Sequence, residues 1–445
     1  MKAEVVICGA GIAGVSAAFF LARAGMREIL LVDERPPLTL TSQYSTECYR
    51  NAWPQPAMRA LMDRSIDWLE KLAEESGNRF RLNRNGYLYV VTQEAARAAL
   101  LRRAEQLEVA GVRPLRVQKD AFRVAKITPK PENGNKAKGI DLLLGPEVIS
   151  QHYPYLNSET QAALFVRRAG WMSAQQLGMY LLEQARERGV QVRLARLERV
   201  QVEKGRIVAV TLSDGTRLET PCLVNAAGPM LSEVNALVGE SYPVFTELHQ
   251  KVAFHDTKRV VPRETPLLIL DEPQRLPWTE EEAQALQEDP ETRYLTETLP
   301  GGAHLRPEGG EESDVVLMLW EYRVHKMPPR WPLPLDPLAP EVILRGLMRL
   351  LPGLQVYREH LPRPQVDGGY YTLTPDHLAL IGPGETKGFY LIGALGGYGI
   401  MAACGAGELL SRHVLGEPLP DYAAAFLPER FAKGDWKAPE EDGKL

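Results

Sequence analysis

Residues 4–35, EVVICGAGIAGVSAAFFLARAGMREILLVDER, decide the fold of this chain. The short apolar run at residues 4–8 predicts a buried strand, and the run rich in alanine, phenylalanine and leucine at 14–24 predicts a helix. Residues 28–32 predict a second buried strand. A strand, a helix and a further strand in this order are the unit from which α/β proteins are built. The N-terminal stretch therefore predicts an α/β fold.

The turn between the first strand and the helix carries a glycine pattern with a known physical use. Gly9, Gly11 and Gly14 form GxGxxG, and Asp33 ends the second strand about 20 residues further on. The glycines permit a tight turn, a close approach of phosphate and close packing of the helix, whose first N–H groups attract anions. Asp33 can accept the hydroxyl groups of a ribose, which disfavours NADP. The pattern predicts a dinucleotide site, the alternative being a glycine turn without a ligand.

Composition excludes several classes of protein. The 445 residues include 52 Lys and Arg against 57 Asp and Glu, a net charge of −5, so no nucleic-acid partner is expected. The four cysteines are far apart and no metal-ligand spacing is present, so neither a disulfide framework nor a metal site is expected. The glycines within residues 5–22 favour a strand, turn and helix over a signal peptide or membrane span. We expect a cytoplasmic protein without a transmembrane segment.

Strand and helix patterns recur in the middle of the chain and at its C-terminal end. Residues 172–189 and 400–415 predict helices, while residues 223–226 and 389–393 predict buried strands. Residues 241–325 are rich in strand patterns and read as an insertion. The helix at 400–415 follows a second glycine-rich turn, whose N–H groups could face an anionic group such as a reduced flavin. The alternative is a glycine loop that only packs against the sheet.

Together these motifs resemble the FAD-dependent oxidoreductases of the D-amino-acid oxidase and sarcosine oxidase family. The resemblance extends over nearly the whole chain, and it is strongest to the branch of the sarcosine oxidase β subunit. It rests on the glycine motif with VDER (32–35), TSQYSTECYRNAW (41–53), NAAGP (225–229), HLRPEGG (304–310), DGGYYTLTPDHLALIGP (367–383) and GALGGYGIMAACGAGELL (393–410).

The resemblance implies a Rossmann-type FAD-binding domain and a mixed β-sheet substrate domain, both made of discontinuous segments. Residues 1–85, 150–240 and 365–430 would form the FAD-binding domain. Residues 86–149 and 241–364 would form the substrate domain, and 431–445 a C-terminal tail.

The family's cofactor contacts carry over onto matching positions of this chain. The first glycine turn would hold the pyrophosphate, residues 33–35 and 197 the adenosine, residues 42–50 the ribityl chain and flavin, and the second glycine turn the pyrimidine ring. The implied FAD-binding residues are Gly9, Gly11, Ile12, Ala13, Gly14, Asp33, Glu34, Arg35, Ser42, Ser45, Thr46, Leu197, Ala227, Gly228, Gly397, Tyr398, Gly399, Ile400 and Met401.

Three departures from the family pattern concern the cofactor and the substrate. Tyr371 stands where glycine oxidase and D-amino-acid oxidase have a carboxylate-binding arginine. Met401 stands where monomeric sarcosine oxidase has a lysine, and Gly368 aligns near that enzyme's cysteine for covalent flavin attachment. The resemblance therefore implies non-covalent FAD, and the absence of the two usual carboxylate anchors disfavours an ordinary free amino acid as substrate.

Five residues are candidates for substrate binding, although each could equally be structural. Arg50 lies about where monomeric sarcosine oxidase has a carboxylate-binding arginine, and its planar fork suits a carboxylate. The others are His249, Tyr370, Tyr371 and Tyr398, of which the tyrosines could surround an amine.

The family reaction moves a hydride from the carbon beside an amine nitrogen to flavin N5, and no catalytic side chain is assigned here. The first hypothesis is an enzyme that oxidises the C–N bond of a small amine or amino acid resembling sarcosine, glycine or proline. The second is a flavoprotein subunit or assembly factor without independent turnover. A third is a purely NAD-linked dehydrogenase. The expected partners are a small-molecule substrate and either a second copy of the chain or a further subunit of an oxidoreductase complex.

Overall fold

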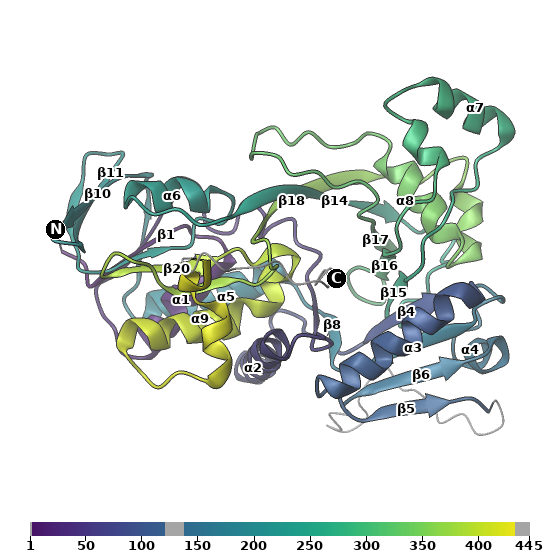
Figure 1. The fold of residues 1–445 in the computed structure, drawn as a ribbon, viewed down its shortest axis with the longest axis horizontal. Helices are drawn as coiled ribbons and strands as arrows, with labels where there is room; N and C mark the ends of the chain where they lie inside the picture. Colours follow the sequence, from purple (N-terminus) through teal and green to yellow (C-terminus); the bar gives the residue numbers. More distant parts are fainter. Residues whose placement is uncertain (1, 121–137, 432–445) are drawn as a thin grey trace.

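The molecule has two lobes, each built on one large sheet. The computed structural model describes residues 2–120 and 138–431. One lobe contains a six-stranded sheet and the other a nine-stranded sheet (Figure 1). Two long antiparallel strands, β14 (Phe245–His255) and β18 (Gln365–Leu373), run from one lobe to the other. Beyond Phe431, the predicted C-terminal tail at 431–445 lies outside the described residues.

The six-stranded sheet has the order β19–β20–β13–β1–β2–β9. Its neighbouring strands are parallel except for the antiparallel pair β19 and β20. The sheet therefore assembles four stretches far apart in sequence, and the predicted α/β fold from discontinuous segments is confirmed. Its strands are β1 (Val5–Cys8), β2 (Ile29–Asp33), β9 (Gln191–Leu194), β13 (Leu223–Asn225), β19 (Leu380–Pro383) and β20 (Phe389–Gly393).

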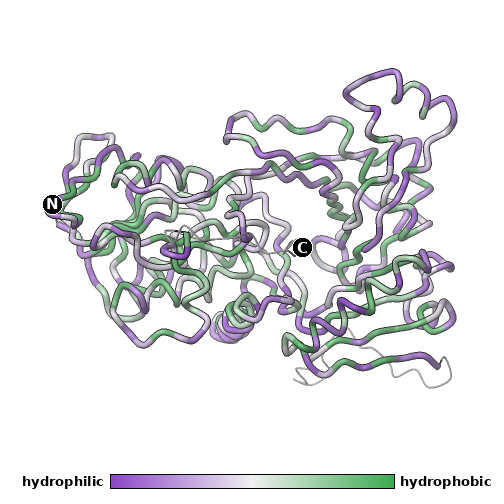
Figure 2. Tube along the Cα trace, viewed as in Figure 1, coloured by the Kyte–Doolittle hydropathy of each residue, from purple (hydrophilic) through white to green (hydrophobic). Residues whose placement is uncertain are grey.

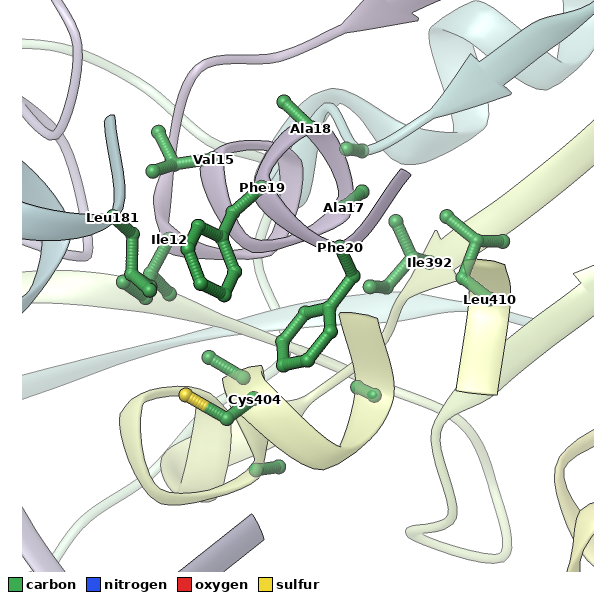
Figure 3. Close-up of a cluster of buried hydrophobic side chains, with 14 of the residues drawn as sticks. Ile12, Val15, Ala17, Ala18, Phe19, Phe20, Leu181, Ile392, Cys404 and Leu410 are labelled. Atoms are coloured by element: carbon green, nitrogen blue, oxygen red, sulfur yellow. The ribbon is translucent and has the colours of Figure 1, made fainter. Parts of the chain in front are cut away.

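Helices cover one face of this sheet. These are α1 (Ile12–Arg23), α5 (Ala174–Glu187) and α9 (Gly399–Leu415), and α2 (Pro56–Glu75) packs on α9. Figure 3 shows Phe20 of α1 pointing towards the helix that carries Cys404. Gly407 of α9 allows close packing, because a Cβ atom there would clash with Ser16 Oγ. The two helices with glycine-rich starts therefore lie side by side.

The other face of the six-stranded sheet is covered differently. Val5 and Ile7 of β1 belong to the core under the helices, whereas Val6 and Cys8 point to the opposite side, as alternation along a strand requires. There they meet the three-stranded sheet and the short helix α6. These elements are β10 (Leu197–Glu203), β11 (Arg206–Leu212), β12 (Arg217–Glu219) and α6 (Leu231–Leu237).

The nine-stranded sheet has the order β18–β14–β17–β16–β15–β4–β7–β6–β5. Only the pairs β4 with β15 and β5 with β6 are parallel, so the sheet is mixed as predicted. Four of the five residues of β6 are apolar and the strand is mostly green in Figure 2, and all five, Asp141 included, are buried. Besides β14 and β18, its strands are β4 (Tyr87–Val91), β5 (Leu115–Gln118), β6 (Ile140–Leu144), β7 (Ala162–Val166), β15 (Leu267–Leu270), β16 (Ala303–Pro307) and β17 (Val315–Leu319).

Helices pack on both faces of the nine-stranded sheet. Tyr89 of β4 faces α3 (Glu94–Val109), and its neighbours Leu88 and Val90 face the core that includes α8 (Ala339–Met348). The remaining α-helices and strands are α4 (Pro146–His152), the exposed α7 (Glu280–Glu288), and a two-stranded sheet of β3 (Cys48–Arg50) and β8 (Ala169–Trp171).

Two strands correct the predicted domain boundaries. The prediction placed residues 150–240 and 365–430 in the FAD-binding domain. However, β7 pairs between β4 and β6, and β18 pairs with β14, so both belong to the nine-stranded sheet. The sequence shows where strands are, but a strand's partner depends on long-range pairing that no local pattern specifies.

Candidate functional site

Three neighbouring cavities follow one another from the ends of β1 and β2 to the nine-stranded sheet. Cavity A contains Val32, Glu34, Ala195 and Leu197, and cavity B contains the first glycine turn together with residues 39–42. Both include Gly9, Asp33 and Ala227 in their walls, so A and B adjoin. Cavity C is lined by Thr46, Cys48, Arg50, Tyr87, Tyr89, Leu267, Ile269, Gly301, Gly302, His304, Leu319, Glu321, Tyr371, Gly397 and Met401.

Cavity A lies where the strand β2 ends, as the predicted adenosine site requires. Glu34, Arg35 and Leu197 line it, and Arg35 Nη1 lies 2.6 Å from Glu34 Oε1. Asp33 has a further role. Its carboxylate accepts hydrogen bonds from the backbone N–H groups of Ala10 at 2.7 Å and Arg35 at 2.9 Å. Asp33 therefore holds the glycine turn in place, and Glu34 is the carboxylate more available to a ribose.

Cavity B is shaped by main chain that only glycine allows. Gly9 has φ +107°, and a Cβ atom there would clash with the carbonyl oxygen of Ala226. A Cβ atom on Gly14 would clash with the carbonyl oxygen of Gly9. Gly14 thus brings α1 against the turn and does not line the cavity itself. Gly11, Ile12, Ala13, Ala227, Gly228 and Gly399 line cavity B.

Residues 41–47 pass between cavities B and C and are held at several points. Ser42 Oγ accepts a hydrogen bond from Ile12 N at 3.0 Å. The carbonyl of Ser45 accepts one from Lys251 Nζ at 3.0 Å, and the carbonyl of Thr46 accepts two from Arg306, at 2.9 and 3.1 Å. Two cations from the nine-stranded sheet therefore fix the segment that the family resemblance places along the flavin.

Arg306 is the more buried of these two cations. Its side chain is 1% exposed, and its guanidinium lies 3.3 Å from Glu47 Oε2 and 2.5 Å from Glu308 Oε2. Its Cζ also lies 5.3 Å from the centre of the Trp171 ring. Burial alone lowers the pKa of Arg306, but the surrounding carboxylates outweigh this and raise it, so the residue stays charged.

Arg50 lies in the wall of cavity C, as its predicted role requires. It ends β3, is 7% exposed, and donates a hydrogen bond from Nη1 to the Tyr89 hydroxyl. Its Cζ lies 4.6 Å from the centre of the Trp53 ring. Its Nε atom is buried and has no hydrogen-bond partner among the described residues. A buried guanidinium with an unused donor beside a cavity suits an anionic ligand.

His249 and Tyr371 form a stacked pair beside the same cavity. Their rings are 3.9 Å apart and nearly parallel, and Tyr371 faces the cavity. His249 Nδ1 lies 2.8 Å from Glu321 Oε1, and Nε2 lies 3.4 Å from Glu247 Oε2. Burial alone lowers the pKa of His249, but the two carboxylates outweigh it and raise the pKa to about 9. His249 therefore supports the cavity from behind as a cation.

Three predicted residues lie elsewhere than their proposed roles suggest. Tyr370 faces cavity B, since it alternates with Tyr371 along β18, and its hydroxyl bonds to the backbone of Arg330. Tyr398 packs edge-on against Trp53 and donates its hydroxyl proton to the His377 carbonyl. Neither tyrosine lines cavity C. Ile400 is a core residue at the start of α9, while its neighbours Gly397 and Met401 line cavity C.

Sequence reasoning missed several residues that line cavity C. They are Tyr87, Tyr89, His304 and Glu321, whereas Cys48 lies within the predicted segment 42–50. A signal existed for the two tyrosines, because they alternate along the predicted strand GYLYVVT and must share a face. His304 stands in a motif that was recognised without a role. Nothing local distinguishes Glu321 from the many exposed glutamates of this chain.

The arrangement fits a dinucleotide whose reactive ring lies between cavities B and C. Glycine-lined main chain and the start of α1 suit a pyrophosphate, and cavity A beside them suits an adenosine. The start of α9 supplies residues to both B and C. The fit rests on space that a side chain would fill and on helix N-termini that face it. No helix among the described residues is long and apolar enough to cross a membrane.

Two curated proteins are similar to this chain in sequence. The chain is 27% identical to human dimethylglycine dehydrogenase, named as mitochondrial, over 97% of this chain and 45% of that protein. It is 23% identical to the mouse pyruvate dehydrogenase phosphatase regulatory subunit, over 60% of this chain and 27% of that protein. The chain therefore spans less than half the length of these relatives.

Solved structures share the fold at lower identity. L-proline dehydrogenase from P. horikoshii superposes with a TM-score of 0.75 and 21% identity, covering 98% of this chain and 99% of that one. Glycine oxidase from Geobacillus kaustophilus gives a TM-score of 0.73 and 16% identity, covering 96% and 99%.

The family model described as FAD dependent oxidoreductase matches residues 4–413. This match covers both glycine turns and every strand that lines the three cavities. The match shows that the cofactor is FAD. It therefore excludes the third hypothesis, a purely NAD-linked dehydrogenase, which the first glycine turn alone could not exclude. The chain belongs to the family of FAD dependent oxidoreductases.

Proposed function

We propose that this protein oxidises the C–N bond of a small amine that carries a carboxylate, with FAD as electron acceptor. The observation that carries the proposal is the buried Arg50 in the wall of cavity C, with an unused Nε donor. The cavity adjoins the start of α9 through Gly397 and Met401. A carboxylate bound by Arg50 would hold the substrate beside the place where the flavin is expected.

The roles of this chain's residues follow from the shape and charge of cavity C. Arg50 binds the carboxylate through its fork, and Tyr89 fixes the fork in place. The apolar walls formed by Leu267, Ile269 and Leu319 exclude water from the reacting carbon. When bound, FAD supplies the acceptor for the electron pair released from the carbon beside the nitrogen. The protein then has to position that carbon and hold the amine in its unprotonated form.

The names of the relatives support a substrate of this class. They include dimethylglycine dehydrogenase, L-proline dehydrogenase, glycine oxidase and iminodiacetate oxidase, whose named compounds all carry an amine one carbon from a carboxylate. Tyr371 in place of the family's arginine and Met401 in place of its lysine leave Arg50 as the proposed carboxylate anchor. We therefore propose sarcosine, glycine or proline-like amino acids as the first compounds to test.

Anaerobic mixing of the FAD-loaded protein with sarcosine, proline, glycine and D-amino acids tests this function. Loss of the flavin absorbance near 450 nm with one of them is expected. Arg50→Met should then lower the second-order rate constant for flavin reduction about 100-fold, since a buried charge pair costs about 3 kcal/mol to break. The control Arg217→Met changes an exposed guanidinium that pairs with Glu219 on β12, away from cavity C, and should leave the rate unchanged. If none of the compounds bleaches the flavin, the proposed substrate class is wrong.

The alternative is a flavoprotein subunit or assembly factor without turnover of its own. One observation favours it, namely that one relative is named a regulatory subunit. Copurification of a stable partner with a flavin that no amine reduces would support this alternative. A monodisperse single chain that turns over an amine contradicts it, and its mass in solution shows whether the chain forms a homo-oligomer.

We also retain a cytoplasmic location as a proposal. Its support is that all four cysteines, Cys8, Cys48, Cys222 and Cys404, are free and buried in the described residues, which suits a reducing compartment. Fractionation of cells that contain the native protein tests it, and recovery in an organelle or a secreted fraction would contradict it.

A further inference from the structure

One face of the nine-stranded sheet carries the wall of cavity C and, directly beyond it, a half-buried carboxylate. Leu267 and Ile269 of β15 line the cavity, and Ile269 pairs with Tyr89 of the neighbouring strand β4. The backbone N–H of Asp271, just beyond β15, donates a hydrogen bond to the carbonyl of Val90 at 2.8 Å and so continues this pairing. Because side chains alternate along a strand, Asp271 lies on the same face as the two cavity residues. Asp271 is therefore the next side chain in line after the wall of cavity C.

Asp271 is paired with a cation on the helix that covers this face. Its Oδ2 atom lies 2.7 Å from Nη1 of Arg103, a residue of α3. The Cζ atom of Arg103 also lies 5.1 Å from the centre of the Tyr89 ring. The hydroxyl group of the same tyrosine accepts the hydrogen bond from Arg50, the proposed carboxylate anchor. Two guanidinium groups therefore contact one tyrosine, and one of them is bound to the carboxylate of Asp271.

Arg50 is close enough to Asp271 for the two charges to interact. Burial raises the pKa of Asp271, and the positive charges of Arg103 and Arg50 both oppose this effect. Arg50 has a buried Nε donor without a partner among the described residues, and a carboxylate is the group that best satisfies such a donor. An Asp271 that had lost Arg103 would therefore compete with a substrate carboxylate for Arg50.

We propose that Arg103 is a positioning residue that keeps the carboxylate of Asp271 engaged, so that the fork of Arg50 stays available to the substrate carboxylate. This inference rests on the proposed function. Arg103 is not among the residues that line cavity C, so it acts through Asp271 and does not touch the substrate. No covalent bond changes in this role, and no proton is moved.

The other carboxylates near this part of the sheet are engaged elsewhere. Glu321, which lines cavity C, is paired with His249 behind the cavity. Glu272, next to Asp271 in the chain, accepts hydrogen bonds from the backbone N–H groups of Thr92 and Gln93 at 2.8 and 2.9 Å. Asp271 is thus the carboxylate whose pairing decides whether Arg50 is available.

Arg103→Met tests this role in the FAD-loaded protein. Stopped-flow flavin reduction at increasing concentrations of the active amino acid gives its dissociation constant and the limiting rate of reduction. The variant should bind the amino acid about tenfold more weakly, which corresponds to about 1.4 kcal/mol. The limiting rate should change less than about twofold, because substrate that does bind meets the same flavin.

Two further variants of α3 serve as controls. Arg103→Lys keeps a cation beside Asp271 and should retain most of the affinity. Arg97→Met removes a cation from the same helix, where it pairs with the exposed Glu94, and should leave both constants unchanged. An Arg103→Met protein with the affinity of wild type would contradict the proposal.

Asp271→Asn, introduced in two backgrounds, separates this role from a simple loss of positive charge. In wild type Asp271 is already paired, so Asp271→Asn alone should change the affinity for the amino acid little. In Arg103→Met the same substitution removes the competitor of Arg50 and should restore the affinity about tenfold. If Arg103 merely attracted the anion through its charge, Asp271→Asn would raise the affinity equally in both backgrounds. Equal gains, or no restoration in the double variant, overturn the proposal.

A second measurement does not depend on turnover. The FAD-loaded protein is titrated with 2-furoate, which has a carboxylate but no amine to oxidise, and binding is followed by the change in the flavin absorbance spectrum. Arg103→Met should weaken the binding of 2-furoate about tenfold. It should leave the binding of 2-furamide unchanged, because this compound has the same ring without the charge. An equal loss for both compounds would mean that cavity C has been deformed, and it contradicts the proposal.

The two proposals fail in different ways. If wild-type protein is not reduced by any amine, the proposed function is wrong. If wild type is reduced and Arg50→Met impairs the reaction, but Arg103→Met binds the amino acid as wild type does, the proposed function stands and the role of Arg103 is wrong.

Discussion

Cavities B and C take neighbouring residues from the segments 370–372 and 396–401, yet most of their walls come from different parts of the polypeptide. Cavity B is shaped by backbone at Gly9 and by the start of α1, so its walls follow from the spacing of a few glycines. Cavity C is shaped by side chains from β3, β4, β15, β16, β17 and β18 and the start of α9. The glycine turn of cavity B is encoded in one short stretch, although residues 226–230 and 392–399 complete its walls. Cavity C forms only once distant strands have paired.

This difference shows which parts of a binding site can be predicted from a short stretch of sequence. A phosphate site made of N–H groups needs a turn geometry, and turn geometry is local. A substrate site made of side chains needs the register of several strands, and register is set by the whole sheet. Substitutions that change the backbone in cavity B, and others that change side chains around cavity C, test this difference.

The largest effect is expected from Gly14→Val. A Cβ atom at this position would clash with the Gly9 carbonyl oxygen and push α1 away from the glycine turn. We expect the purified variant to contain essentially no FAD, measured as the ratio of absorbance at 450 nm to that at 280 nm. Gly310→Val, where a Cβ atom meets open space, is the control and should keep its flavin. A Gly14→Val protein with full flavin content would show that cavity B does not depend on this backbone contact.

The next effect is expected from Arg306→Met, which leaves Glu47 and Glu308 without their buried cation. Breaking a buried pair in this way typically costs about 4 kcal/mol of the free energy of unfolding. Urea denaturation of the FAD-loaded protein measures it. Arg79→Met removes an exposed partner of Glu183 and should change the stability little. Equal stabilities of the two variants would mean that the segment between cavities B and C is held by other contacts.

The fold was predictable from sequence to a large extent, for a reason visible in the two glycine turns. GAGIAG and GALGGYG each follow a buried strand and open a helix, so strand, turn and helix were all placed locally. The pairing of β7 and β18 within the nine-stranded sheet was not predictable from local patterns. The partner of β18, for example, is β14, which lies more than 100 residues earlier in the chain.

The substrate side was predictable only in part. Arg50 lies in cavity C, but the sequence could not tell which of Tyr370 and Tyr371 faces it, because that depends on the twist and register of β18. Tyr398 stands in a glycine turn like a ligand residue, yet its ring packs on Trp53. Arg306 and His304 were missed because a charged or polar residue in a strand carries no sign of what it meets across the sheet.

A smaller effect is expected from pH, through His249. Its pKa of about 9 in the folded protein lies above the ordinary value of 6.5, because Glu321 and Glu247 stabilise its charged form. Its stabilising contribution, roughly 3 kcal/mol, is therefore complete below pH 6.5 and is lost as the pH rises through 9. Urea denaturation at pH 6, 7.5 and 9.5 should show this slope in wild type. In His249→Gln the slope should be shallower, and identical slopes would contradict the assignment.

The smallest effect is expected from Glu34→Ala in cavity A. This carboxylate is 41% exposed and paired with Arg35, so it is well solvated and its loss should weaken FAD binding only severalfold. Fluorescence titration of the apoprotein with FAD measures the dissociation constant. Glu183→Ala, on the exposed side of α5, should leave that constant unchanged. A loss of FAD affinity as large as that of Gly14→Val would show that side chains, and not backbone, contribute most of the affinity for FAD.

The ribbon of β14 and β18 has a consequence for anyone who wishes to redesign this protein. Tyr371 faces cavity C, while Tyr370 and Thr372 on either side of it face cavity B. Alternate residues of β18 thus line different cavities. Substitutions at position 371 would change the wall of cavity C, and substitutions at 370 and 372 would change the wall of cavity B. An insertion of one residue upstream in this strand would exchange the two sets at once.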